Sequence, residues 1–174
     1  MTVQSKIWML IDYPHAQHAV IEAAKGSLEF FWWYSNSPLE QAIEASPLWV
    51  QVPNMEHSLL TQFPSAPLFT TLAEDNKFKQ HIMSLLIVRA SNNKPHFLRF
   101  YEPQYLSGWL SSLDSVRLSD FLGPITSISW LENNKEQHLR NPVQISEYVQ
   151  RDFAWFQLTD EDWAQLKLAF SQSR

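Results

Sequence analysis

Apolar residues recur along the chain at two spacings, which predict short strands alternating with short helices. Continuous apolar runs at residues 7–11 and 48–52 are typical of strands. Between them, apolar positions three or four residues apart predict a helix from about Pro14 to Gly26, with a stripe of Ala16, Ala19, Val20, Ala23 and Ala24. The alternation predicts an α/β (α+β) fold, a single domain with a mixed β-sheet flanked by helices.

The middle of the chain carries the most detailed local pattern. Strand-like runs at residues 87–90 and 96–101 are separated by turn-forming residues 91–95, which predicts a β-hairpin. Pro103 cannot continue a strand ladder and suits a first helical turn, so a helix should begin there with Glu102 as its cap. The apolar stripe of this helix is Leu106, Trp109, Leu110 and Leu113.

Capping signals predict the other helices. Ser37 and Glu40 form a capping box, and so do Thr159 and Asp162, where acidic residues favour the positive end of the helix dipole. Gly123 followed by Pro124 is a typical helix stop. The predicted helices begin near Pro14, Pro38, Asn54, Asp75, Pro103, Val116 and Thr159.

The remaining apolar runs complete the predicted sheet. Strands are expected at residues 28–34, 67–72 and 125–131, and the polar stretch 132–144 predicts a turn and one edge strand. We therefore expect an α/β core over residues 1–131. Residues 132–174 form a short C-terminal extension that ends in a helix and packs on the same domain.

Composition and charge narrow the possible functions. The chain of 174 residues has no cysteine, which excludes disulfides, thiolate metal sites and cysteine nucleophiles. Its net charge is −5, and residues 1–60 hold two basic against six acidic side chains, which disfavours nucleic acid as a partner. No apolar run is long enough for a signal peptide or a membrane span, so we predict a cytoplasmic protein.

Few residues combine into a pattern of catalysis or metal binding. His15 and His18 have the spacing of metal ligands on a helix, but they lie opposite the alanine stripe, where a solvated face accounts for them. Asp114 and Asp120 border helix ends, where aspartate commonly caps. No nucleophile elbow or phosphate loop occurs among the three glycines. We predict no metal, no cofactor and no enzymatic activity.

Two other features offer alternatives. Arg99 beside Tyr101 could bind a carboxylate, or could form an ion pair with Glu102 that joins strand to helix. The aromatic run at residues 30–34 has large rings in succession, while a strand directs alternate residues to opposite faces. Either this chain covers both faces or one face binds a partner. The candidate partner-binding residues are Phe31, Trp32, Trp33 and Tyr34.

Several of these residues together resemble a known family. They are Asp12 after the first strand, the segment Arg99-Phe100-Tyr101-Glu102-Pro103, and Gly123-Pro124. This order and spacing resemble the type VI secretion effector chaperones, also called effector adaptors and catalogued as a domain of unknown function. The likeness extends over nearly the whole chain. It departs where the family usually has Asp at position 102 and small residues at positions 13–14, and many relatives carry a longer helical C-terminal lobe.

The resemblance implies a function that the residues alone do not give. It implies a cytoplasmic, non-enzymatic protein of a Gram-negative bacterium. Such a protein binds a toxic effector and helps to load it onto the VgrG-type spike protein of the type VI secretion system. Two alternatives remain: an immunity-type protein that neutralises a toxin, and an uncharacterised small α/β enzyme.

Overall fold

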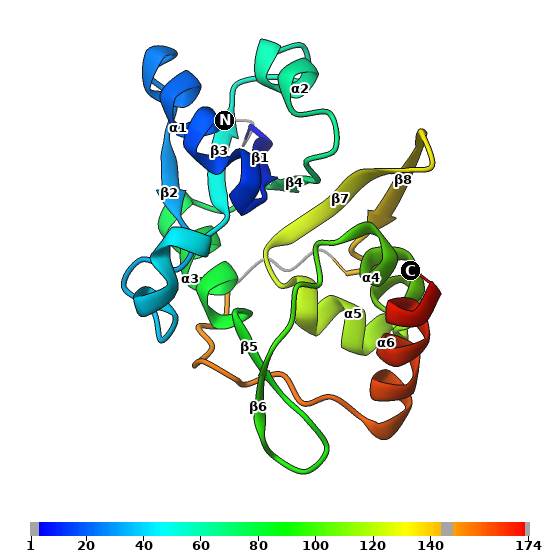
Figure 1. The fold of residues 1–174 in the computed structure, drawn as a ribbon. Coiled ribbons are helices and arrows are strands. Elements are labelled where there is room, and N and C mark those ends of the chain that lie inside the picture. The colour runs from blue at the N-terminus through cyan, green and yellow to red at the C-terminus, as the bar shows by residue number, and fades with distance from the viewer. Residues whose placement is uncertain (1–3, 144–147, 173–174) are drawn as a thin grey trace. The chain divides into compact units, whose positions relative to one another are not determined.

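The computed structural model describes residues 4–143 and 148–172 and has the predicted α+β fold (Figure 1). The chain divides into two compact units, one of residues 1–72 with 127–138 and one of residues 73–126 with 139–174. The first unit is built on β1 (Lys6–Ile11), α1 (Tyr13–Lys25), β2 (Phe30–Trp32), the 3-10 helix η1 (Glu40–Ala45), β3 (Leu48–Val52), α2 (Ser58–Gln62), β4 (Leu68–Thr71), β7 (Ile125–Glu132) and β8 (Lys135–Arg140).

The elements of the second unit are mainly helical. They are α3 (Asp75–Ser84), β5 (Ile87–Arg89), β6 (Pro95–Phe97), α4 (Pro103–Gly108), the 3-10 helix η2 (Leu110–Ser112), α5 (Ser115–Leu122) and α6 (Asp160–Gln172). The β7–β8 hairpin crosses the boundary expected at residue 131. The division into a core over residues 1–131 and an extension over residues 132–174 stays a prediction.

A six-stranded sheet in the order β2-β3-β1-β4-β7-β8 forms the framework of the first unit. The pairs β2–β3, β3–β1 and β1–β4 run antiparallel, where a mixed sheet was expected. The predicted turn and edge strand after residue 131 are confirmed: Asn133 and Asn134 both have positive φ, as a two-residue hairpin turn requires, and β8 lies at the edge of the sheet.

Helix α1 covers one face of β1 and β3, as the alanine stripe predicts. Asp12 ends β1 and caps α1, its Oδ1 accepting a hydrogen bond from the Tyr13 backbone N–H at 2.9 Å. Ala16, Ala19 and Ala23 are fully buried in a cluster with residues of β1, β3 and α2. Small side chains let the helix lie close to the strands, so an alanine stripe is sufficient to pack this face.

The aromatic run forms only a short strand. The strand β2 ends at Trp32, and Trp33 and Tyr34 lie in a turn in which the Tyr34 N–H donates to Ser46 Oγ at 3.0 Å. The strand expected over residues 28–34 is therefore too long. The helix expected after Ser37 is a 3-10 helix that begins only at Glu40, because the Ser37 hydroxyl donates to the Tyr34 carbonyl at 2.6 Å and stabilises the preceding turn.

The cap predicted for α2 is also wrong. Asn54 lies in the preceding turn, where its side chain accepts from the Glu56 N–H at 2.9 Å, and the helix begins after His57. The His57 Nδ1 accepts from the Leu59 N–H at 3.2 Å and so acts as the cap. An Asx turn and a helix cap use the same kind of hydrogen bond, so the sequence pattern does not distinguish them.

In the second unit the β5–β6 hairpin is confirmed, but β6 ends at Phe97, whereas the strand was expected to reach Tyr101. Phe100 and Tyr101 lie in a turn and are both buried. Consecutive residues of a strand point to opposite faces, so a turn buries both rings on one side more easily. Pro103 is the first residue of α4 and Glu102 its cap position, as predicted.

The helix at Pro103 is shorter than its stripe suggests. It ends at Gly108 and continues as the 3-10 turn η2, yet Leu106, Trp109 and Leu110 remain fully buried. Gly108 lies close to α6: an added Cβ would be 2.9 Å from the Cβ of Ala169.

The predicted capping box of α6 is confirmed by reciprocal hydrogen bonds between Thr159 and Asp162, at 2.8 and 3.0 Å.

Candidate functional site

The residues of the family-like motif at 99–103 hold the second unit together locally. The Nε of Arg99 lies 2.9 Å from Glu102 Oε1, and both side chains are about one third exposed. The Gln104 side-chain amide donates to the other Glu102 oxygen at 2.6 Å. The Arg99 guanidinium also lies 5.6 Å from the centre of the Tyr101 ring. Of the two alternatives for Arg99, the ion pair with Glu102 is the one observed.

Behind this motif is a cluster of aromatic rings. Phe121 lies at its centre, with edge-to-face contacts to Phe100 at 5.0 Å, Trp109 at 5.4 Å and Phe156 at 5.0 Å between ring centres. All four are buried. Edge-to-face pairs are favourable beyond the area they bury, so this cluster is a major part of the core of the unit.

One buried carboxylate joins three elements of the second unit. Asp162 accepts hydrogen bonds from Arg117 Nη1 at 2.8 Å and from the Trp109 indole N–H at 3.2 Å, and Arg117 Nη2 lies 2.6 Å from its other oxygen. Burial opposes ionisation of Asp162, but the hydrogen bonds from Arg117, Thr159 and Trp109 outweigh it and hold the pKa below its ordinary value. The sequence predicts the cap at Asp162 but gives no signal for Arg117, which is 45 residues away.

Gly123, part of the family-like motif, contacts a buried histidine. His81 is 1% exposed, and its Nε2 lies 2.7 Å from the Phe121 carbonyl, to which it donates. Gly123 has φ +53°, and a Cβ added to it would collide with the His81 ring. Burial is the largest influence on the pKa of His81 and lowers it. The hydrogen bond to Phe121 raises the pKa, and the charge of Arg151 lowers it further, so that the pKa is about 4.

We expect this buried histidine to make the protein sensitive to acid. The unfolded chain takes up a proton near the ordinary pKa of 6.5, while the folded protein excludes it down to about pH 4. Between these values the unfolded state binds more protons, so stability should fall from pH 6.5 to pH 4, by about 3 kcal/mol. Denaturant unfolding at pH 7.5 and 4.5 would measure this loss.

A non-titrating variant provides the control for this pH dependence. His81→Gln keeps a side-chain N–H that can donate to the Phe121 carbonyl but carries no titrating ring. Its unfolding free energy should fall less between the two pH values than that of the wild type. An equal fall in both proteins would assign the acid sensitivity to other groups.

The residues considered for catalysis or metal binding lie on α5 or at its start in the second unit, and on α1 in the first. Asp114 caps α5, its Oδ1 accepting from the Arg117 N–H at 2.9 Å, and Asp120 is exposed. His15 and His18 are exposed on α1 beside the ring of Phe63. Within residues 4–143 and 148–172 no three His, Asp or Glu side chains gather as a metal site would require. The same described residues contain no helix of the length and hydrophobicity needed to cross a membrane.

The candidate partner-binding run is largely enclosed. Trp33 is 0% and Tyr34 5% exposed, and Phe31 and Trp32 are half-buried. Phe31 packs against two sheet residues, with its ring 5.5 Å from that of Trp8 and 6.2 Å from that of Trp49. These contacts place the run in the core of the first unit. Partner binding by Phe31, Trp32, Trp33 and Tyr34 stays a prediction.

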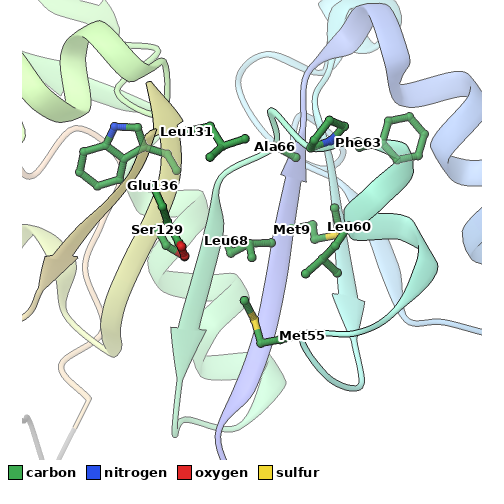
Figure 2. A pocket seen from close by; sticks show the side chains of 11 residues that line it. Met9, Met55, Leu60, Phe63, Ala66, Leu68, Ser129, Leu131 and Glu136 are labelled. Atoms are coloured by element: carbon green, nitrogen blue, oxygen red, sulfur yellow. The ribbon is translucent and has the colours of Figure 1, made fainter. Parts of the chain in front are cut away.

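The first unit carries an apolar pocket that the sequence does not reveal. It has a volume of about 220 Å³ and is lined by residues of strands β1, β4, β7 and β8 and of the segment around α2 (Figure 2). Met9 of β1 and Leu68 of β4 line its centre. We call it the Met55 pocket; its other lining residues are Met55, Leu60, Phe63, Pro64, Ala66, Ser129, Trp130, Leu131 and Glu136.

The second unit has an apolar pocket of its own, with a volume of about 240 Å³. It lies among the β5–β6 hairpin, α4 and α6, and is lined by Leu158 and Trp163, which flank the capping box of α6. Phe170 of α6 also lines this pocket and is 48% exposed. In the same part of α6 it is the neighbouring Ala169 that is buried.

Comparison with known families decides the classification. The family described as a domain of unknown function, DUF4123, matches residues 7–120. The chain belongs to the DUF4123 family. No curated protein and no solved structure matches it.

The DUF4123 match includes two parts of the family-like motif, Asp12 and the segment 99–103. Gly123 and Pro124, and the whole β7–β8 hairpin, follow the matched region. In this DUF4123 protein the motif residues cap helices, pair charges and fill the core. Among the described residues, each unit also carries an apolar pocket.

Proposed function

We propose that this DUF4123 protein is a non-enzymatic adaptor, which binds a type VI secretion effector in the cytoplasm and helps to load it onto the VgrG-type spike protein. The observation that carries the proposal is the family match over residues 7–120, which includes the motif at residues 99–103 that resembles effector adaptors. Its apolar pockets are compatible with protein partners, since apolar surface on a folded protein commonly marks such sites.

The structural roles of the charged residues support a non-enzymatic protein. Arg99 and Glu102 pair with each other, Asp162 pairs with Arg117, and Asp114 caps a helix. Each of these groups has a partner that accounts for its position. An enzyme active site instead needs a nucleophile or an acid–base pair directed at one substrate position, and the pairings of these charged groups do not suggest such an arrangement.

Co-expression tests the adaptor function. The protein should co-purify with the effector and the spike protein encoded beside it in its host, and deleting its gene should abolish the association of effector with spike. An effector lacking its toxin domain should still bind. Binding that requires the toxin domain and neutralises the toxin would instead indicate an immunity protein.

Activity screens test the remaining alternative. The purified protein should turn over no ester, phosphate or peptide substrate. A turnover abolished by changing Asp114, Asp120 or His18 would contradict the proposal and indicate an enzyme.

A further inference from the structure

The net charge of the protein belongs entirely to one of its two units. Residues 1–72 and 127–138 contain three lysines and no arginine against eight carboxylates, a difference of −5. The other unit contains ten basic and ten acidic side chains and is neutral. All the described residues that line the Met55 pocket belong to the acidic unit.

The rim of the Met55 pocket exposes large apolar side chains beside carboxylates. Met55 is 51% and Leu131 37% exposed, on the α2 loop and on β7 respectively. Among the described residues that line the pocket, Glu136 is the one with a charged side chain, and Glu56 follows Met55 in the α2 loop. Figure 2 shows Leu131 and Glu136 on the hairpin side of the central Leu68.

We propose that the Met55 pocket binds a segment of a partner protein in which one or two large apolar side chains are flanked by lysine or arginine. This inference rests on the proposed adaptor function and specifies the partner surface. The volume of about 220 Å³ is sufficient for such side chains, because a cavity of about 150 Å³ already accommodates benzene. The acidic unit favours approach of a basic segment.

The same charge argues against other occupants. A unit of net charge −5 is repelled by anionic lipid, so a membrane is disfavoured. A second copy of this chain would bring either another acidic unit or a neutral one to the pocket, neither of which supplies the complementary charge. A basic, apolar protein segment satisfies both properties of the site.

Three labelled helical peptides of equal length would test the proposal by fluorescence anisotropy. The first carries leucines on one face and lysines on the other, the second has glutamate for each lysine, and the third has serine for each leucine. We expect the protein to bind only the first, and its association rate to fall as salt rises. Equal binding of the second peptide, or binding of the third, would overturn the proposal.

Variants locate the binding on the protein. Met55→Asp and Leu131→Asp should each weaken binding of the first peptide about tenfold, although they add negative charge, because they remove apolar contact. Ile21→Asp is the matched control: it adds the same charge to the same unit at a side chain that is 54% exposed on α1, and should leave affinity unchanged. Circular dichroism checks that all three variants fold.

A charge variant tests the electrostatic attraction separately from the apolar contact. Glu136→Lys should slow association of the first peptide and reduce its salt dependence. Unchanged affinity for the first peptide in both Met55→Asp and Leu131→Asp would overturn the proposal. It would also be overturned if the wild type self-associates and Met55→Asp does not, because the pocket would then bind a second copy of the chain. Light scattering at several protein concentrations measures that state.

Failure of the pocket proposal can be distinguished from failure of the proposed adaptor function. If the effector and spike proteins co-purify equally with wild type, Met55→Asp and Leu131→Asp, the adaptor function stands and the Met55 pocket is not its binding site. If the first peptide binds with the expected variant pattern but neither secretion protein does, the pocket stands and the adaptor function fails.

Discussion

Replacing Gly123 by alanine should destabilise the protein by several kcal/mol. The backbone has φ +53° and ψ −117°, a conformation that residues with a Cβ rarely adopt, which costs about 1–3 kcal/mol. The new Cβ would also lie 2.7 Å from His81 Nδ1, and overpacking of a core costs about another 1–3 kcal/mol. Denaturant unfolding would measure the loss.

Two comparisons separate these causes. Gly26→Ala is the control, because that glycine has φ −85° and an added Cβ would meet only ordinary contacts from 3.5 Å outward. In a His81→Ala background the collision is removed, so Gly123→Ala should cost only the backbone strain. An equal cost in both backgrounds would show that the His81 ring adds nothing.

Replacing Trp109 by alanine should cost about 3–5 kcal/mol, the range for truncating a large buried aromatic side chain. Trp109 is 0% exposed, contacts the rings of Phe121 and Phe156, and donates its indole N–H to Asp162. Its removal leaves a cavity and takes one hydrogen bond from a buried carboxylate. The midpoint of chemical denaturation should shift accordingly.

A conservative variant tests the contribution of the indole N–H. Trp109→Phe keeps most of the ring but loses the donor to Asp162, so it should cost less than Trp109→Ala. Trp163→Ala removes a ring that is only half-buried and serves as the control on α6. A loss for Trp163→Ala equal to that for Trp109→Ala would contradict the central position of Trp109 in the core.

The elements that the sequence predicts correctly depend on local chemistry. Asp12, Gly26 and the Thr159–Asp162 box define helix ends through hydrogen bonds within a few residues, and these signals are written in adjacent positions. The alanine stripe of α1 predicts its buried face for the same reason. Periodicity is sufficient where one helix packs on one sheet.

The incorrect predictions arise where contacts between residues far apart in the chain determine the local structure. The hydrogen bond from the Tyr34 N–H to Ser46, twelve residues away, accompanies the early end of β2. Arg89 of β5 pairs with residues 156–158, while Phe100 and Tyr101 lie in a buried turn. The Arg117–Asp162 pair and the Met55 pocket likewise join segments far apart in the chain. No local pattern encodes such contacts, because each depends on the completed topology.

The sheet of the first unit has a consequence for synthesis of the protein. Its strands β1 to β4 precede residue 73, while β7 and β8 follow residue 124, and β7 neighbours β4. As the chain leaves the ribosome, β4 therefore presents an unpaired edge until the intervening segment has been translated. A polypeptide stopped at residue 120, where the family match ends, would keep that edge permanently open, so β4 is the strand most exposed to aggregation in a truncated or nascent chain.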